Sequence, residues 1–184
     1  MKKFILTAIV AVASVAANAQ VWIGGEAGYT TSKTTFDGNK VSSQNGVKVL
    51  PEIGYSLNEN WDVALAIGLT HGDLSDANHV TSNANSFEFH PYVRYSYAKV
   101  GDLKFFLDGG FSYANTHYSG NDDNQNDWKI AINPGLAYSL SPKTTLVAHL
   151  GEVSYGFSKQ GDLKKNSFNL GVDNAITFGV YFSL

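Results

Sequence analysis

One histidine stands at a spacing that could serve metal binding. His90 lies between Glu88 and Tyr92, and residues two apart on a β-strand project from the same face. A zinc site needs several such ligands, and no second histidine shares this face. We therefore expect His90 to be a hydrogen-bonded histidine inside the protein rather than a metal ligand.

An oxygen-rich stretch, NDDNQND at residues 121–127, is a candidate Ca²⁺ loop. An EF-hand loop that starts at Asp122 requires Gly at position 127 and Glu at position 133. The chain has Asp127 and Asn133 there, so the motif is not met and a solvated polar loop is expected. No phosphate-binding, dinucleotide-binding or nucleophile-elbow motif occurs. The residues therefore predict no catalytic site, cofactor or metal.

The composition narrows the class of protein. The 184 residues favour one domain. Only 16% are charged, against roughly 25% in an average soluble domain. With 10 Tyr and 11 Phe the chain is too aromatic to be disordered. A net charge of −3 argues against a nucleic-acid partner, which would need a basic face. The absence of Cys excludes disulfides, Cys-ligated zinc and thiol catalysis.

The N-terminus has the plan of a secretory signal peptide. A basic start, MKK, precedes the apolar run FILTAIVAVASVA at residues 4–16 and an A-x-A site at residues 17–19. The apolar run is too short for a membrane-spanning helix, which needs about 20 residues. We expect residues 1–19 to be removed, so that the mature domain is 20–184. Its charge would be −5, from 11 basic and 16 acidic residues.

The mature chain alternates in character with period two. In the segment 168–184, eight of the nine even positions are apolar, and the odd positions are mostly small or polar. Such a segment forms a strand with one apolar and one polar face. The same pattern predicts seven further strands, at residues 21–30, 47–57, 61–70, 87–97, 103–113, 128–140 and 144–157.

The segment 144–157 does not keep one parity. Leu146 and Leu150 share a face, but Val153 and Tyr155 continue on the other parity. One inserted residue has this effect, so we expect a β-bulge near Gly151 and Glu152; a misplaced strand boundary is the alternative.

Short and long connectors alternate along the chain. Three are tight, at residues 58–60, 100–102 and 141–143. Four are long and polar, at about 31–45, 71–86, 114–127 and 158–167. Eight strands with tight turns at one rim and long loops at the other are typical of an antiparallel up-and-down barrel.

Alternation alone fits two kinds of barrel. A soluble lipocalin-type barrel turns its apolar face inward, whereas an outer-membrane barrel turns it outward to lipid. The segments run from about 10 to 17 residues, beyond the usual 5–6 of a globular strand and sufficient for a transmembrane strand of about 9–11.

Aromatic residues gather at both ends of the predicted strands, as they do where rings meet lipid headgroups. The girdle at the short-turn end is expected to contain Tyr55, Trp61, Tyr97, Tyr138 and Phe182. The girdle at the long-loop end is expected to contain Tyr29, Phe87, Tyr113, Trp128, Tyr155 and Phe168.

Ionisable residues of both signs share the polar faces. An eight-stranded lumen is just filled by side chains, so charges inside it must pair or form hydrogen bonds. On a soluble barrel the same residues would form a solvated outer surface. The predicted lumen network consists of Glu26, Lys48, Glu52, Asp62, Glu88, His90, Arg94, Lys104, Asp108, Lys129 and Asp173.

The signal-peptide junction ANAQ at residues 17–20 and the closing strand NAITFGVYFSL at residues 174–184 carry a family resemblance. The chain resembles small eight-stranded bacterial outer-membrane proteins of the OmpA transmembrane-domain and OmpX type, and the porin-like outer membrane protein beta-barrel domain of Bacteroidetes. The resemblance implies an outer-membrane location after export to the periplasm. It implies outer-membrane lipid and lipopolysaccharide as partners, and the barrel-insertion machinery as the partner of the last strand. That strand usually ends in Phe, whereas this chain ends in Leu184.

Outer-membrane lipid A deacylases are also eight-stranded and use His, a Ser two residues later, and Glu. His149 and Glu152 resemble part of that pattern, but Gly151 replaces the Ser. We therefore expect a non-enzymatic protein in which His149 makes an unrelated contact with a carboxylate.

The expected function is a structural or surface-binding role through the long extracellular loops. A narrow or gated porin-like channel is the alternative. A lipid-modifying enzyme and a soluble ligand-binding barrel remain further alternatives.

Overall fold

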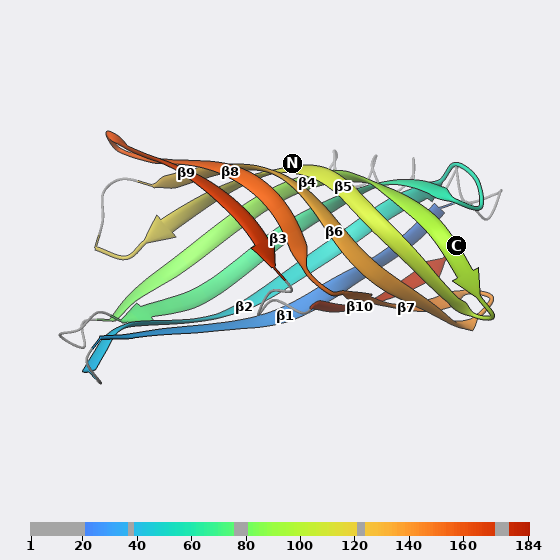
Figure 1. Ribbon diagram of the computed structural model, residues 1–184, viewed down its shortest axis with the longest axis horizontal. Helices are drawn as coiled ribbons and strands as arrows, with labels where there is room; N and C mark the ends of the chain where they lie inside the picture. The colour runs from blue at the N-terminus through green and yellow to red at the C-terminus, as the bar shows by residue number, and fades with distance from the viewer. Residues whose placement is uncertain (1–20, 37–38, 76–80, 121–123, 172–176) are drawn as a thin grey trace, which may run out of the picture.

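The computed structural model describes residues 21–36, 39–75, 81–120, 124–171 and 177–184, which form an antiparallel β-barrel (Figure 1). The predicted signal peptide and Asp173 lie outside the described residues. No helix in the described part of the chain is long and apolar enough to cross a membrane. The strands are β1 (Val21–Phe36), β2 (Asn39–Ser56), β3 (Trp61–Ser75), β4 (Thr81–Val100), β5 (Leu103–Tyr118), β6 (Gln125–Ser141), β7 (Thr144–His149), β8 (Glu152–Gln160), β9 (Leu163–Gly171) and β10 (Thr177–Ser183).

The ten strands occupy eight positions in the wall of the barrel. β7 and β8 both pair with β6, and they form one strand that is broken near its middle. β9 pairs with β8 and β10 pairs with β7, so these two strands share the last position. Pairing of β1 with β10 and of β5 with β6 completes the ring. The prediction of a closed, eight-stranded antiparallel barrel is confirmed.

Both described ends of the barrel chain lie at the short-turn rim, as expected. The backbone N–H of Leu184 donates to the carbonyl of Val21 over 3.0 Å. The turn before β3 is stabilised by Asn58, whose side-chain oxygen accepts from the backbone N–H groups of Asn60 and Trp61 at 2.9 and 3.0 Å.

The break between β7 and β8 is the predicted bulge. Gly135 of β6 lies opposite His149, and Ile132 lies opposite Val153. Three steps along β6 therefore match four steps along β7 and β8, which adds one residue to that strand. The inward parity changes from odd at Val147 and His149 to even at Ser154.

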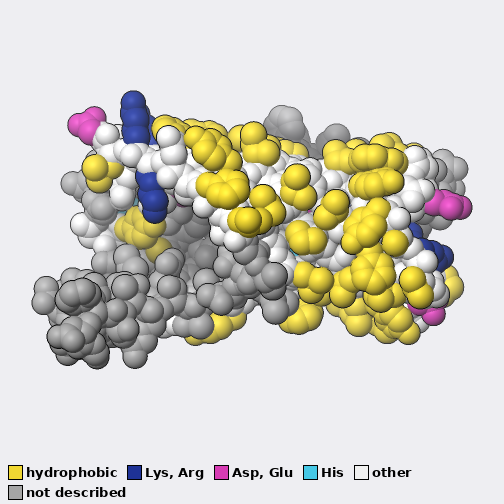
Figure 2. Space-filling view, in the orientation of Figure 1, with side chains coloured by type: hydrophobic (Ala, Val, Ile, Leu, Met, Phe, Trp, Pro, Cys, Tyr) yellow, Lys and Arg dark blue, Asp and Glu magenta, His cyan; other side chains and the backbone are white. Residues whose placement is uncertain are grey.

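The barrel has apolar side chains outside and charged side chains inside, the reverse of a soluble protein. Apolar side chains on the outside are widely exposed, including Ile130 at 66% and Phe178 at 67%, whereas Arg94 inside is 5% exposed. Figure 2 shows hydrophobic side chains spread over the outer surface of the barrel. In water such a surface would aggregate, so its natural surroundings are hydrocarbon. This arrangement excludes the lipocalin-type alternative.

The predicted girdle residues lie on this outer face. Eight of the eleven are among the exposed large hydrophobic residues, and Tyr55, Tyr113 and Trp128 are half-buried. Near the short turns the rings of Trp61 and Tyr95 lie 4.6 Å apart. Toward the other rim the rings of Tyr113 and Trp128 lie 5.6 Å apart.

The four long loops were predicted to be longer than the structure shows. β1 and β2 remain paired as far as Phe36 and Asn39, and β3 and β4 as far as Ser75 and Thr81. β8 and β9 pair up to Gln160 and Leu163, which leaves a two-residue turn. Beyond the lipid both faces of a strand can be polar, so the alternation fades while the backbone ladder continues. Most residues assigned to loops therefore belong to projecting hairpins.

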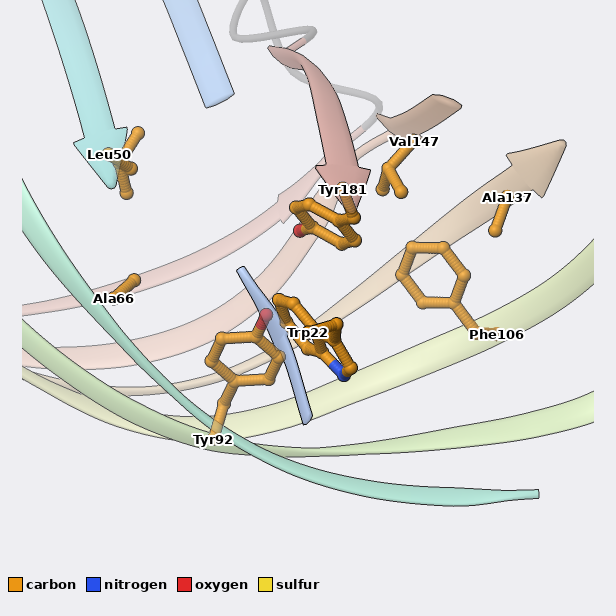
Figure 3. Packing of buried hydrophobic residues seen from close by; sticks show 8 residues of the cluster. All are labelled: Trp22, Leu50, Ala66, Tyr92, Phe106, Ala137, Val147 and Tyr181. Carbon is orange, nitrogen blue, oxygen red and sulfur yellow. The ribbon is translucent and has the colours of Figure 1, made fainter. Parts of the chain in front are cut away.

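Four aromatic rings fill the lumen on the short-turn side. Trp22, Tyr92, Phe106 and Tyr181 are each no more than 7% exposed and point inward (Figure 3). The rings of Trp22 and Tyr181 stack with their centroids 4.4 Å apart.

Three of these rings lie over glycines directly opposite in the ladder. Phe106 is opposite Gly135, Trp22 is opposite Gly54, and Tyr181 is opposite Gly24. A Cβ at Gly135 would lie 2.2 Å from the Phe106 ring, and one at Gly54 would lie 2.1 Å from the Trp22 ring. The absence of a side chain is therefore what lets the rings lie flat on the barrel wall.

We predict that Gly135→Ala destabilises the folded barrel, because the new methyl group must displace the Phe106 ring. Overpacking of this kind costs about 1–3 kcal/mol. The temperature at which heat-modifiable gel mobility is lost should fall.

Gly109→Ala is the matched control, since a Cβ at Gly109 meets nothing within 4 Å. Equal thermal stability of the two variants would contradict close packing of the Phe106 ring on Gly135.

Candidate functional site

The candidate site is the lumen, where the structure brings together most of the predicted polar residues. Glu26, Glu52, Arg94 and Asp108 are buried there. The side chains of Lys48, Glu88, His90 and Lys129 line a cavity of about 220 Å³ in the same lumen.

Two of the predicted residues lie elsewhere. Asp62 is at the short-turn end and accepts a hydrogen bond from Ser56 over 2.5 Å. Lys104 lies opposite Lys99 in the ladder, and both border a separate cavity of about 360 Å³ with Glu59. Neither contributes to the central network.

Arg94 and Asp108 form the central ion pair. The guanidinium donates through Nε and Nη2 to the two carboxylate oxygens, each over 2.7 Å. The side chains of both residues are at most 6% exposed. Bidentate geometry of this kind gives a strong, well-oriented pair. It also provides the partner that a buried charge requires.

Aromatic faces surround the guanidinium of Arg94. Its carbon atom lies 3.9 Å from the centroid of the Phe106 ring, within cation–π distance. Three further ring centroids lie within 6 Å, those of Tyr181, Tyr92 and Trp22. The ion pair and the rings together form one unit, which we call the lumen block (Trp22, Tyr92, Arg94, Phe106, Asp108 and Tyr181).

His149 connects two carboxylates inside the lumen. Its Nδ1 lies 3.0 Å from Glu26 and its Nε2 lies 2.8 Å from Asp108. A neutral imidazole has only one N–H, so both contacts are hydrogen bonds when both ring nitrogens carry hydrogen. His149 then acts as a second cation beside Arg94.

His149 was not among the residues predicted for the lumen network. A contact between His149 and a carboxylate was predicted, but Glu152 was the only carboxylate named beside it. The alternation of residues could have revealed it. Leu146 and Leu150 occupy the outward-facing even positions of this strand, so His149, at an odd position, must face inward. The bulge then turns Glu152 inward as well, where its carboxylate lies 2.5 Å from Lys129.

Hydroxyl groups extend the network across the barrel. The Tyr181 hydroxyl lies 2.8 Å from Glu26 and 3.0 Å from Glu52, and Tyr92 donates to Glu52 over 2.5 Å. Thr177 donates to Glu26 over 2.5 Å. Residues from β1, β2, β4 and β10 are thereby connected through the interior.

The cavity lies on the hairpin side of the lumen block. Lys48 pairs with Glu88 over 2.6 Å, and Lys129 pairs with Glu152 over 2.5 Å, at its walls. Tyr92 is the only ring of the lumen block among the residues described as lining it. The lumen block therefore borders this cavity on its short-turn side.

The other candidate ligand groups are engaged with the protein. Asp127 accepts hydrogen bonds from Gln125 over 2.9 Å and from Ser158, and Asn124 contacts His117. Positions 121–123 of the oxygen-rich stretch lie outside the described residues. Within the described parts of the chain, no three His or carboxylate side chains are grouped as metal ligands.

An apolar outer belt, a closed antiparallel sheet and an ion-paired interior define a transmembrane β-barrel. The family model of the outer membrane protein beta-barrel domain matches residues 4–174, and the chain belongs to that family. It is therefore a small barrel of the bacterial outer membrane, as its sequence predicted.

Solved structures show the same fold. Neisserial surface protein A is 14% identical, with 91% of this chain and 98% of that chain covered and a TM-score of 0.55. The translocator domain of the autotransporter NalP from Neisseria meningitidis is 12% identical, with 100% and 96% covered and a TM-score of 0.50. No curated protein matches the chain.

We predict that the barrel gives no conductance steps in a planar bilayer, because the lumen block closes it. Replacing the three glycine-facing rings in a Trp22→Ala, Phe106→Ala, Tyr181→Ala variant removes most of the block and should produce steps. Heat-modifiable gel mobility establishes that the variant is folded.

A variant changed on the outer face, Trp61→Ala with Tyr95→Ala, should give no conductance steps, like the unmodified barrel. Regular steps from the unmodified barrel would contradict a closed lumen.

Proposed function

We propose that the protein is a closed membrane anchor that presents its outer hairpins for binding at the cell surface. The observation that carries the proposal is the combination of a blocked lumen with hairpins that continue past the outer aromatic girdle. Beyond Leu69 and Phe87 the β3–β4 ladder contains six further residue pairs, Thr70–Ser86 to Ser75–Thr81. At about 3.3 Å per residue and a tilt near 40°, this extension is roughly 15 Å high.

The chemistry of the described hairpins suits hydrogen bonding. Between the girdle and its tip, the β5–β6 hairpin presents Asn115, Asn126, His117 and Asn124, which are joined by side-chain hydrogen bonds of 2.9–3.3 Å. Such bonds hold the amides in fixed positions without using all of their donors and acceptors. A rigid row of amides is suited to the hydroxyl groups of a carbohydrate.

The same features support a non-catalytic role. Arg94, Lys48, Lys129 and His149 are each paired with a carboxylate in the lumen, and the Ser that would complete the deacylase pattern is Gly151. The name of the structurally similar Neisserial protein describes a surface protein. That name supports the proposal only by analogy of fold.

The experiment uses bacteria that display the full chain and a variant in which an Asn-Gly turn replaces residues 116–125. The cells are applied to a printed array of polysaccharides and glycoproteins. We expect the full chain to bind at least one glycan about tenfold more strongly than the variant, a difference of about 1.4 kcal/mol.

A second variant with Ser139→Gly at the short-turn end controls for expression and should bind like the full chain. Binding that is equal for the full chain and the shortened hairpin would overturn the role of this hairpin. The absence of binding to any arrayed glycan by all three would overturn the carbohydrate assignment.

A further inference from the structure

The β8–β9 hairpin carries three lysines and one acidic residue, Asp162 of the turn, near its tip. Lys159 of β8 lies directly opposite Lys164 of β9 in the ladder, and Lys165 follows on the other parity. All three side chains are exposed. Figure 1 shows this hairpin projecting from the barrel at the upper left, and Figure 2 shows Lys and Arg side chains in the same place.

The Lys159–Lys164 pair is unfavourable in isolation. Like charges directly opposite each other in an antiparallel pair repel and destabilise the ladder. The ion pairs described in the structure involve neither lysine. An anion bound between the two ammonium groups would turn this repulsion into attraction.

The two lysines also continue the lipid-facing surface. Val153 and Tyr155 are 38% and 55% exposed on the outer face, while Ser154 between them is buried at 7%. Continuing with the same parity, β8 places Phe157 and then Lys159 on this outer face. On β9 the partners of Val153, Tyr155 and Lys159 are Leu170, Phe168 and Lys164.

The height of the pair matches a lipid headgroup. Lys159 is two residues beyond Phe157, which corresponds to about 5 Å along the membrane normal for a tilted strand. The headgroup layer is roughly 5–8 Å thick on each side of the hydrocarbon core. Long lysine side chains can adjust further by extending toward the interface.

Other outer hairpins carry neutral pairs at comparable places. Beyond Leu69 and Phe87, His71 contacts Asn85 over 2.8 Å. Beyond Tyr113 and Trp128, Asn115 donates to Asn126 over 2.9 Å. Among the hairpin side chains that the structure describes, cross-strand lysines occur beyond the girdle in β8–β9.

We propose that Lys159 and Lys164 bind a phosphate group of an outer-leaflet glycolipid of the lipid A type. The phosphate accepts hydrogen bonds from both ammonium groups, and the acyl chains lie along the apolar face formed by Tyr155, Phe168 and Leu170. The site is separate from the surface-binding function proposed above, which concerns the polar amides of other hairpins.

The test is titration of the detergent-folded full chain with bisphosphorylated lipid A, followed by native mass spectrometry. A Lys159→Gln, Lys164→Gln variant should bind about 30-fold more weakly, from two lost contacts to the membrane surface. Binding by the unmodified chain should weaken as salt is raised. Unchanged affinity in the double variant would overturn the proposal.

The matched control is Lys99→Gln with Lys104→Gln. These lysines are also opposite each other in a ladder, but at the short-turn rim beside Glu59. This control should bind lipid A like the unmodified chain, and so should Lys165→Gln, which alters the other face of the same hairpin. Equal weakening in the three variants would show a non-specific charge effect and contradict the site.

Two further probes identify the ligand. Lipid A from which both phosphates have been removed should lose the dependence on Lys159 and Lys164. Inorganic phosphate at the concentration of the lipid should not displace it. A retained dependence in the first case, or displacement in the second, would overturn a glycolipid phosphate as the ligand.

Discussion

The structure depends on one constraint: within hydrocarbon, each backbone N–H and C=O must find its partner in the protein. A sheet meets this requirement when it closes, so that neither edge strand faces lipid. Here closure is made by β1 with β10 and by β5 with β6. With eight strand positions the resulting cylinder is narrow, and its interior holds little more than side chains. The distribution of residues between the two faces follows from this geometry.

The narrow interior accounts for the chemistry of the lumen. Arg94 could not remain charged there without Asp108. His149 contacts both Asp108 and Glu26 and so connects the two carboxylates. Tyr181 and Tyr92 supply hydroxyl groups to the remaining carboxylate oxygens. Polar groups that are individually costly to bury thus stabilise one another, and aromatic rings pack around the guanidinium of Arg94. Such a lumen is better suited to rigidity than to transport.

The alternation of residue types was sufficient to predict the strands and their number. The outward direction of the apolar face was predicted from the segment lengths, the aromatic girdles and the mixed charges of the polar faces. The alternation located the bulge too, because the change of parity between Leu150 and Val153 is visible in the sequence. The strand ends were less predictable. Beyond the lipid, residues such as Thr116 and Gln125 are polar on either face, so period two no longer distinguishes a paired hairpin from a loop.

The lumen was predicted only in outline. Parity placed Glu26, Glu52, Arg94 and Asp108 on the polar face, but could not show which of them meet across the barrel. Those contacts depend on register and stagger between strands that are distant in sequence. Trp22 and Tyr181 were also missed as lumen residues. The glycine opposite each ring becomes a signal only when the pairing of strands is known.

The central claim is that the apolar face meets lipid while the lumen block is shielded from it. The three tryptophans test this directly, since Trp61 and Trp128 belong to the outer face and Trp22 to the lumen. In vesicles of lipids with brominated acyl chains, the fluorescence of the unmodified protein should be quenched. A Trp61→Phe, Trp128→Phe variant, which retains only Trp22, should keep its fluorescence. Strong quenching of Trp22 would contradict the account.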